Sequence, residues 1–298
     1  MPTDTSDWPE IYLGYHRFRS PPEFTVPEVT ATIGTASVSV LHGQPGSGTE
    51  IVHAQSDVGE IIRQMSVGKW EIFVAREDAG LVVSSYTYLV FGVQRVGTDV
   101  VLTRDSMSRT QFPEGDDAEK WLFHSLTTVR PITDRGSAKG FAFDSMFFET
   151  SYLDQLRSEL SARFTASASL LGAEQGSSTR SVDSNNYHLS FIIESDGHSG
   201  DTRPLAAPDD ISTLPGVSVE NRKFEINGAD AGFSRVTMVE DGKQYTWFDA
   251  ALFWLDEKQV VPDTLLTSAH LKFIYAVKPN IEAEAHAVGI LTSINRGI

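Results

Sequence analysis

The sequence contains no cysteine. Disulfide bonds, a cysteine nucleophile and cysteine-ligated zinc are therefore excluded. The absence does not identify a cellular compartment, because cytosolic and exported proteins can both lack cysteine.

Long apolar runs are missing as well, since none approaches the roughly 18 residues that a membrane span needs. The first residues, Met1–Trp8, contain neither a basic segment nor an apolar one. We therefore expect no membrane span and no signal peptide in this sequence. Two explanations stay open: the protein is cytosolic, or a leader has been removed.

Basic residues are scarce, with 24 Lys and Arg against 40 Asp and Glu, a net charge of -16 and a pI near 4.8. Nucleic-acid binding by phosphate neutralisation is excluded, because it needs clustered positive charge. The acids form no tail or block, so they serve solubility or the steering of a basic partner.

What is present indicates a folded chain of two domains. Hydrophobic residues make up 40% of the 298 positions, a globular composition, and the length favours two domains over one. In the first region, β-rich patterns cover 11–18, 31–41 and a meander between 70 and 102. Apolar residues spaced by three and four predict a helix over 52–65.

A second helix is predicted to close the first domain. Asp116 and Glu119 fit a capping box, apolar residues continue on one face to Val129, and Pro131 prevents continuation. The following polar stretch, 132–140, has the chemistry of a linker. The predicted domains are therefore 1–131 and 141–298.

The second domain is predicted from similar signals. A short helix is expected over 153–164, and strands over the ranges 189–194, 217–226 and 271–277. Two strands around Asp241-Gly242 predict a hairpin, and the pattern from 281 to 292 predicts a terminal helix with Asn280 as its N-cap. The predicted class is α+β: each domain is a mainly antiparallel β-sheet with one or two packed helices.

Motifs for catalysis are weak. The loop Gly43–Glu50 has the glycine spacing of a phosphate loop, but Thr49 replaces the lysine and Glu50 would repel an anion. No two of the eight histidines have the i, i+4 spacing of a helical zinc site, and no G-x-S-x-G elbow is present. Glu194, Asp196 and His198 lie together at a predicted strand end, where an ordinary solvated loop is the competing interpretation. We predict no catalytic residue, metal or cofactor.

One resemblance covers the chain in order of elements. The segment Gly140-Phe141-Ala142-Phe143-Asp144 resembles the G-F-C-[IF]-D block of the fourth family of type VI secretion lipase immunity proteins. The aromatic segment that ends Phe253-Trp254-Leu255-Asp256 and the closing helix are also similar in order. Ala142 stands where the family usually has cysteine, and no glycine follows Asp144.

The resemblance implies a periplasmic, non-enzymatic protein that binds a cognate lipase effector, in a 1:1 heterodimer, and clamps its lid or active-site entrance. From loop position and charge we expect acidic residues to contact the partner. These are Glu114, Asp116, Asp117, Asp196, Asp201, Asp209, Asp210, Asp256 and Glu257. Two alternatives stay open: a carboxylate-dependent hydrolase, and a surface or phage-type structural subunit.

Overall fold

The computed structural model describes most of the chain. The described ranges are 4–78, 87–108, 121–134, 140–150, 161–169, 190–199, 215–240, 242–254, 265–276 and 281–296. Within them, no helix is long and apolar enough to cross a membrane.

The chain divides into two compact units whose limits differ from the predicted domains. Unit 1 combines Met1–Val29 with Arg163–Ile298, and unit 2 is Thr30–Ala162. Strand pairing crosses the predicted limits: Thr127 pairs with Thr150 across the predicted linker. At the other end, Asn295 pairs with Arg17, which joins the two ends of the chain in unit 1.

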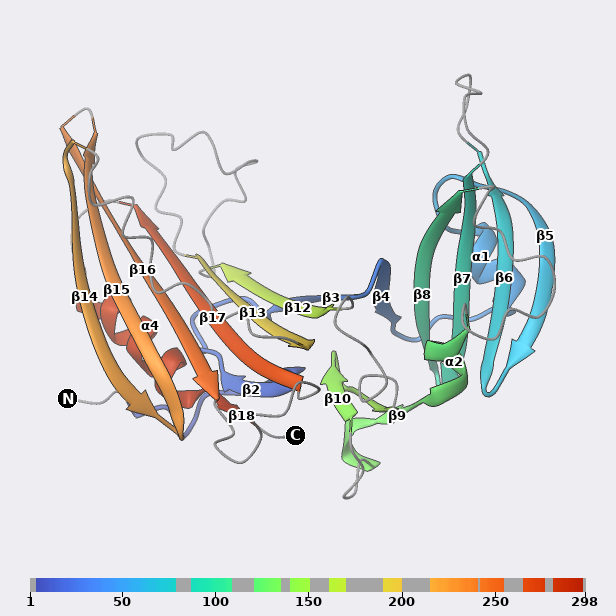
Figure 1. Cartoon of the computed structure of the whole chain (residues 1–298), viewed down its shortest axis with the longest axis horizontal. Helices are drawn as coiled ribbons and strands as arrows, with labels where there is room; N and C mark the ends of the chain where they lie inside the picture. Colours follow the sequence, from blue (N-terminus) through green and yellow to red (C-terminus); the bar gives the residue numbers. More distant parts are fainter. Residues whose placement is uncertain are drawn as a thin grey trace. The chain divides into compact units, whose positions relative to one another are not determined.

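Unit 1 contains a sheet of long antiparallel strands (Figure 1). In spatial order they are β14 (Val217–Ile226), β15 (Ala229–Glu240), β16 (Lys243–Trp254), β17 (Leu265–Ala276), β13 (Ser190–Ser199) and β12 (Ser161–Ser169). The predicted hairpin is confirmed, with Glu240 paired to Lys243 and a φ of +73° at Gly242. The strands predicted over 189–194, 217–226 and 271–277 are also confirmed.

A terminal helix and a small hairpin complete unit 1. Helix α4 (Ile281–Ser293) confirms the predicted terminal helix and packs on β16, β17 and β2 (Figure 1). Its C-terminal carbonyl groups at Thr292 and Ile294 accept hydrogen bonds from the Asn227 side chain at 3.2 and 2.7 Å. Because the last carbonyls of a helix lack partners inside it, Asn227 acts as a cap from the β14–β15 turn. Residues 277–280 and 297–298, which include the expected N-cap Asn280, lie outside the described residues.

The single strand expected over 11–18 is instead a hairpin. Strands β1 (Glu10–Gly14) and β2 (His16–Arg19) pair with each other, and β2 also pairs with β18 (Asn295–Arg296). The turn requires glycine, because Gly14 has a φ of +63° and a Cβ there would lie 2.3 Å from the Phe164 ring.

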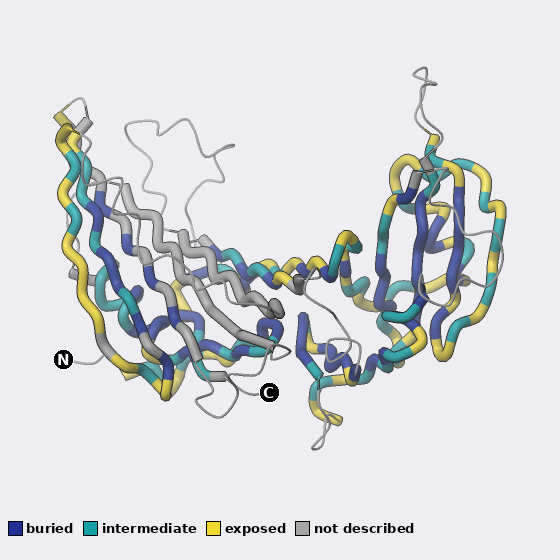
Figure 2. Tube along the Cα trace, viewed as in Figure 1, coloured by how far each residue is buried: buried dark blue, intermediate teal, exposed yellow. Residues whose placement is uncertain are grey.

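Unit 2 contains the predicted β-meander. Its sheet has the order β3 (Glu28–Ile33), β4 (Ala36–Leu41), β8 (Asp99–Ser108), β7 (Thr87–Val96), β6 (Trp70–Glu77) and β5 (Val58–Val67). Most residues of the central strands are buried, whereas the edge strand β5 alternates between half-buried and exposed residues (Figure 2).

The helix predicted over 52–65 is wrong. Helix α1 covers Gly48–His53, and Val58–Val67 is strand β5. Register shifts between Val58 and Ile61 and between Ile61 and Arg63 mark an irregularity near the start of β5, where Val58 and Gly59 are both half-buried before the regular alternation begins. A bulge of this kind places successive inward-facing residues three positions apart, which imitates helical spacing.

The core of unit 2 lies between α1 and one face of the meander. Ile51 and Val52 of α1 join a buried cluster that includes Phe73, Phe91 and Leu102. Each of these five side chains is at most 3% exposed. Burial of apolar surface in this cluster therefore holds the short helix on the sheet.

A second, smaller sheet in unit 2 has the order β10 (Gly140–Phe143), β11 (Met146–Thr150), β9 (Thr127–Pro131). A 3-10 turn covers Ile132–Asp134. Strand β9 is tied to the meander by Trp70 Nε1, which donates to the Thr127 carbonyl at 2.9 Å, and by the Gln94 amide, which donates to the Val129 carbonyl at 3.1 Å. The apolar run at 140–148 is thus a hairpin of β10 and β11, with Phe141 stacked on Phe148.

Two predicted helices differ from the structure. Helix α2 covers only Leu122–Leu126, and Val129 lies in β9. The expected capping box at 116–119 lies outside the described residues. Residues 153–160 of the other predicted helix also lie outside them, whereas Phe164 lies in strand β12. The α+β class, with antiparallel sheets and packed helices, is confirmed.

Candidate functional site

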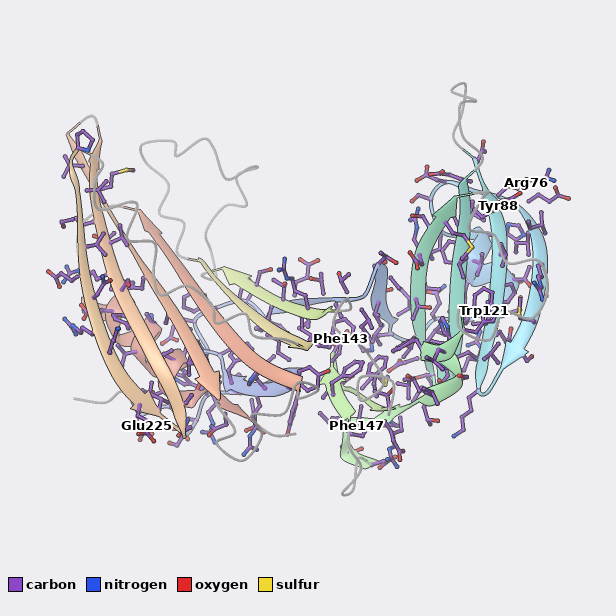
Figure 3. All side chains as sticks on the ribbon, viewed as in Figure 1. Arg76, Tyr88, Trp121, Phe143, Phe147 and Glu225 are labelled. Carbon is purple, nitrogen blue, oxygen red and sulfur yellow. The ribbon has the colours of Figure 1, made fainter. Side chains whose placement is uncertain are left out.

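A cavity of about 300 Å³ lies on the face of the unit 2 meander opposite α1. Successive side chains of β7 and β8 point to opposite faces of the sheet. Phe91 and Leu102 therefore lie in the α1 core, whereas Val90 and Thr103 line the cavity on the other face. Trp121, which directly precedes α2 (Figure 3), is one of the lining residues. The volume is at the lower end of the range for ligand pockets, enough for one side chain or a small molecule.

Buried His124 forms part of the cavity lining and is electrically neutral. Its Nε2 lies 2.9 Å from Thr103 Oγ1, which also accepts the Gly92 N–H at 3.0 Å. Burial lowers the pKa of His124 to about 4. At pH 7 this side chain therefore contributes no positive charge to the cavity.

Among the described lining residues, the charged group is Asp105, on the same face of β8 as Thr103. Its Oδ2 accepts from the Thr35 hydroxyl at 2.9 Å, and its Oδ1 accepts from the Ser106 N–H at 2.8 Å. These hydrogen bonds hold the carboxylate in place and leave acceptor capacity on both oxygens. Within the described part of the chain, Asp105 forms no ion pair.

A second cluster in unit 2 joins the meander to the β10–β11 turn. His42 Nδ1 lies 3.2 Å from Asp99 Oδ2, and His42 Nε2 lies 3.2 Å from Asp144 Oδ2. The hydrogen bond to Asp99 is the main cause that raises the pKa of His42. The Gly43 N–H is the main cause that lowers the pKa of Asp99, and the His42 ring adds to it.

This bridge predicts a pH-dependent contribution to stability. The raised pKa of His42 means that its contribution is complete below the unfolded value near 6.5 and is lost as pH rises through the folded value. The pKa of Asp99 is lowered, so its own contribution is present above 3.8 and is lost as pH falls through the lower folded value. The Asp144→Asn variant should therefore melt about 2 °C below wild type at pH 5.5 and close to wild type at pH 8.5.

Asparagine tolerates the positive φ at position 144, so this comparison leaves the turn geometry unchanged. Thermal unfolding followed by circular dichroism at the two pH values measures the difference. An equal effect at both values would show that the histidine charge has no role.

The loop Gly43–Glu50 has a structural role. Ser47 Oγ accepts from the Glu50 N–H at 3.2 Å, and the Glu50 carboxylate accepts from the Ser47 N–H, which forms a capping box for α1. The Ser47 N–H lowers the pKa of Glu50. The carboxylate expected to repel an anion therefore occupies the helix N-terminus itself.

The expected partner contacts lie almost entirely beyond the described ranges. Only Asp196 is described, and it lies in strand β13 opposite Ser268 instead of in a loop. The neighbouring Glu194 and His198 lie on the same strand. The expected contacts outside the described residues are Glu114, Asp116, Asp117, Asp201, Asp209, Asp210, Asp256 and Glu257.

No cluster of three or more potential metal ligands occurs among the residues that the structure describes. The cavity itself was not predicted from the sequence. Its lining comes from four separated segments, at 33–38, at Val90, at 103–107 and at 121–124. The available signal was the change along β8 from the apolar residues Val100–Leu102 to the polar residues that begin at Thr103.

Comparison with family models and with curated proteins finds no match. Two solved structures are similar along nearly the whole chain. The apo structure of TplEi, an immunity protein of the type VI secretion system from Pseudomonas aeruginosa, has a TM-score of 0.62 at 13% identity and covers 98% of each chain. A chain of the Tle4–Tli4 complex has a TM-score of 0.62 at 15% identity and covers 99% of each chain. The chain therefore has the fold of the type VI immunity protein TplEi and of a chain of the Tle4–Tli4 complex, in agreement with the resemblance of its motifs.

Proposed function

We propose that this chain is an immunity protein that binds and inhibits a cognate effector of a type VI secretion system. The observation that carries the proposal is the likeness to TplEi, which extends over both units and leaves almost no part of either chain unmatched. The second solved structure adds support, because the similar chain there is part of a complex of two proteins, Tle4 and Tli4. Inhibition by binding requires a stable surface and no reacting group.

We further propose that the effector is a lipase and that the chain clamps its lid or active-site entrance in the periplasm. The G-F-A-F-D segment at 140–144 and the order of elements support this identity by resemblance. Stabilising a closed lid is an effective route to inhibition, since about 1.4 kcal/mol shifts the population tenfold. The net charge of -16 would accelerate encounter with a basic surface on the effector. The acidic residues named above, from Glu114 to Glu257, stay proposed contacts.

The rival, a carboxylate-dependent hydrolase, requires a general acid whose pKa is raised. The described carboxyl groups with shifted pKa values are Asp4, Glu50 and Asp99, and all three are shifted downward by hydrogen bonds from backbone N–H groups. These shifts favour the ionised form and suit a structural role.

The proposal predicts a stable heterodimer. Mixed at micromolar concentration with its candidate cognate effector, the protein should elute with that effector as a 1:1 complex in size-exclusion chromatography with light scattering. Separate elution of the two proteins at this concentration would contradict the proposal.

A further inference from the structure

The described lining residues of the cavity on the unit 2 meander supply one negative charge, no positive charge and aromatic side chains. Asp105 supplies the carboxylate, and Trp121 and Phe123 supply the aromatic rings. His124, the basic side chain among the described lining residues, is neutral because of its low pKa. The nearby Arg104 points to the opposite face, where it lies over the Phe91 ring and pairs with Asp57.

We propose that this cavity binds an arginine side chain of a protein partner. The identification of that partner as the effector rests on the proposed function, whereas the chemistry of the cavity does not. The whole chain is negatively charged, so it favours a partner that presents basic residues. This charge complementarity favours a cation as the group that binds in the cavity.

Each part of an arginine side chain finds a matching group. The guanidinium donates hydrogen bonds in a fixed planar geometry, and the two oxygens of Asp105 keep acceptor capacity beside their bonds to Thr35 and Ser106. Aromatic rings attract guanidinium groups and stack on them. The methylene groups of the side chain would pack on apolar lining residues such as Val38 and Val90.

An anionic ligand fits less well. Trp121 Nε1 is a buried donor without a hydrogen-bond partner in the part of the chain that the structure describes, and it would suit an acceptor atom. However, Asp105 would repel an anion, and no described lining residue carries a positive charge to compensate it. The balance of charge therefore favours a cation over a carboxylate or phosphate.

The first experiment uses the full chain and a small probe. Nα-acetyl-arginine amide is titrated while the Trp121 indole N–H signal is followed by NMR, with Trp121→Phe used to assign the signal. We expect a saturable shift. The citrulline analogue has nearly the same shape without the charge, so it should bind at least about tenfold more weakly.

The Asp105→Asn variant tests the carboxylate. An asparagine can accept from the Ser106 N–H and donate to the Thr35 hydroxyl, so the local hydrogen bonds can be kept. Affinity for the arginine probe should fall about tenfold. The matched control is Asp134→Asn, which removes a charge from an exposed carboxylate that also accepts from a threonine hydroxyl in unit 2, outside the cavity.

Equal binding of the arginine and citrulline probes, or unchanged affinity in Asp105→Asn, would overturn the proposal. A complex with the effector together with no response to the arginine probe would overturn the cavity assignment and leave the proposed function intact. The opposite result, a response to the probe without a complex, would overturn the proposed function alone.

Discussion

The Gly140→Ala variant should lose about 3 kcal/mol of unfolding free energy. A Cβ at position 140 would lie 1.9 Å from the carbonyl oxygen of Phe148 and 2.9 Å from its carbonyl carbon. These are backbone atoms of the neighbouring strand, so β10 and β11 would have to separate or shift register. Overpacking of this kind typically costs about 1–3 kcal/mol, and the rigid obstacle here places the cost at the upper end. Urea unfolding followed by far-ultraviolet circular dichroism measures it.

Gly232→Ala is the matched control. Gly232 lies inside strand β15, and a Cβ there would meet no atom within 4 Å. Its effect should stay within about 1 kcal/mol, because alanine also reduces the entropy of the unfolded chain. Similar losses in the two variants would show that the close approach at Gly140 is absent.

The second large effect is expected at Gly92, beside the cavity. A Cβ there would lie 2.4 Å from His124 Nε2 and 2.5 Å from Thr103 Oγ1, which are the two atoms of the buried hydrogen bond. Gly92→Ala should cost about 2–4 kcal/mol, because it overpacks the site and leaves buried polar groups unpaired.

A double-mutant cycle separates this contact from a general loss of packing. Because His124→Ala removes one of the two obstructing side chains, the double variant Gly92→Ala/His124→Ala should lose at least about 1 kcal/mol less than the sum of the single losses. Strictly additive losses would show that an alanine side chain at position 92 does not clash with His124.

The sequence alone was sufficient to predict those elements whose signal lies within a few neighbouring residues. The hairpin around Gly242 and helix α4 were predicted close to their observed limits, because turn residues and apolar periodicity act within a few positions. Strand β5 was predicted as a helix because a bulge near Ile61 changed the spacing of its apolar residues. The pairing partner β6, which determines that register, cannot be deduced from the pattern of β5 alone.

Domain limits and the cavity depended on contacts between distant positions. The pairing of Asn295 with Arg17 assigns both ends of the chain to unit 1. Similarly, Asp105 and Trp121 reach one cavity from separate segments of unit 2. Charge and loop position predict acidic loop residues as partner contacts. The structure adds a different candidate, the Asp105 carboxylate, which accepts hydrogen bonds from Thr35 and Ser106.

If the proposed function holds, this protein acts by binding an effector and holding it inactive. The most direct measurement uses a candidate cognate lipase effector: its hydrolysis of phospholipid is measured against increasing amounts of this protein. We predict a linear fall that reaches zero near equimolar amounts. Undiminished hydrolysis in the presence of excess protein would contradict the claim.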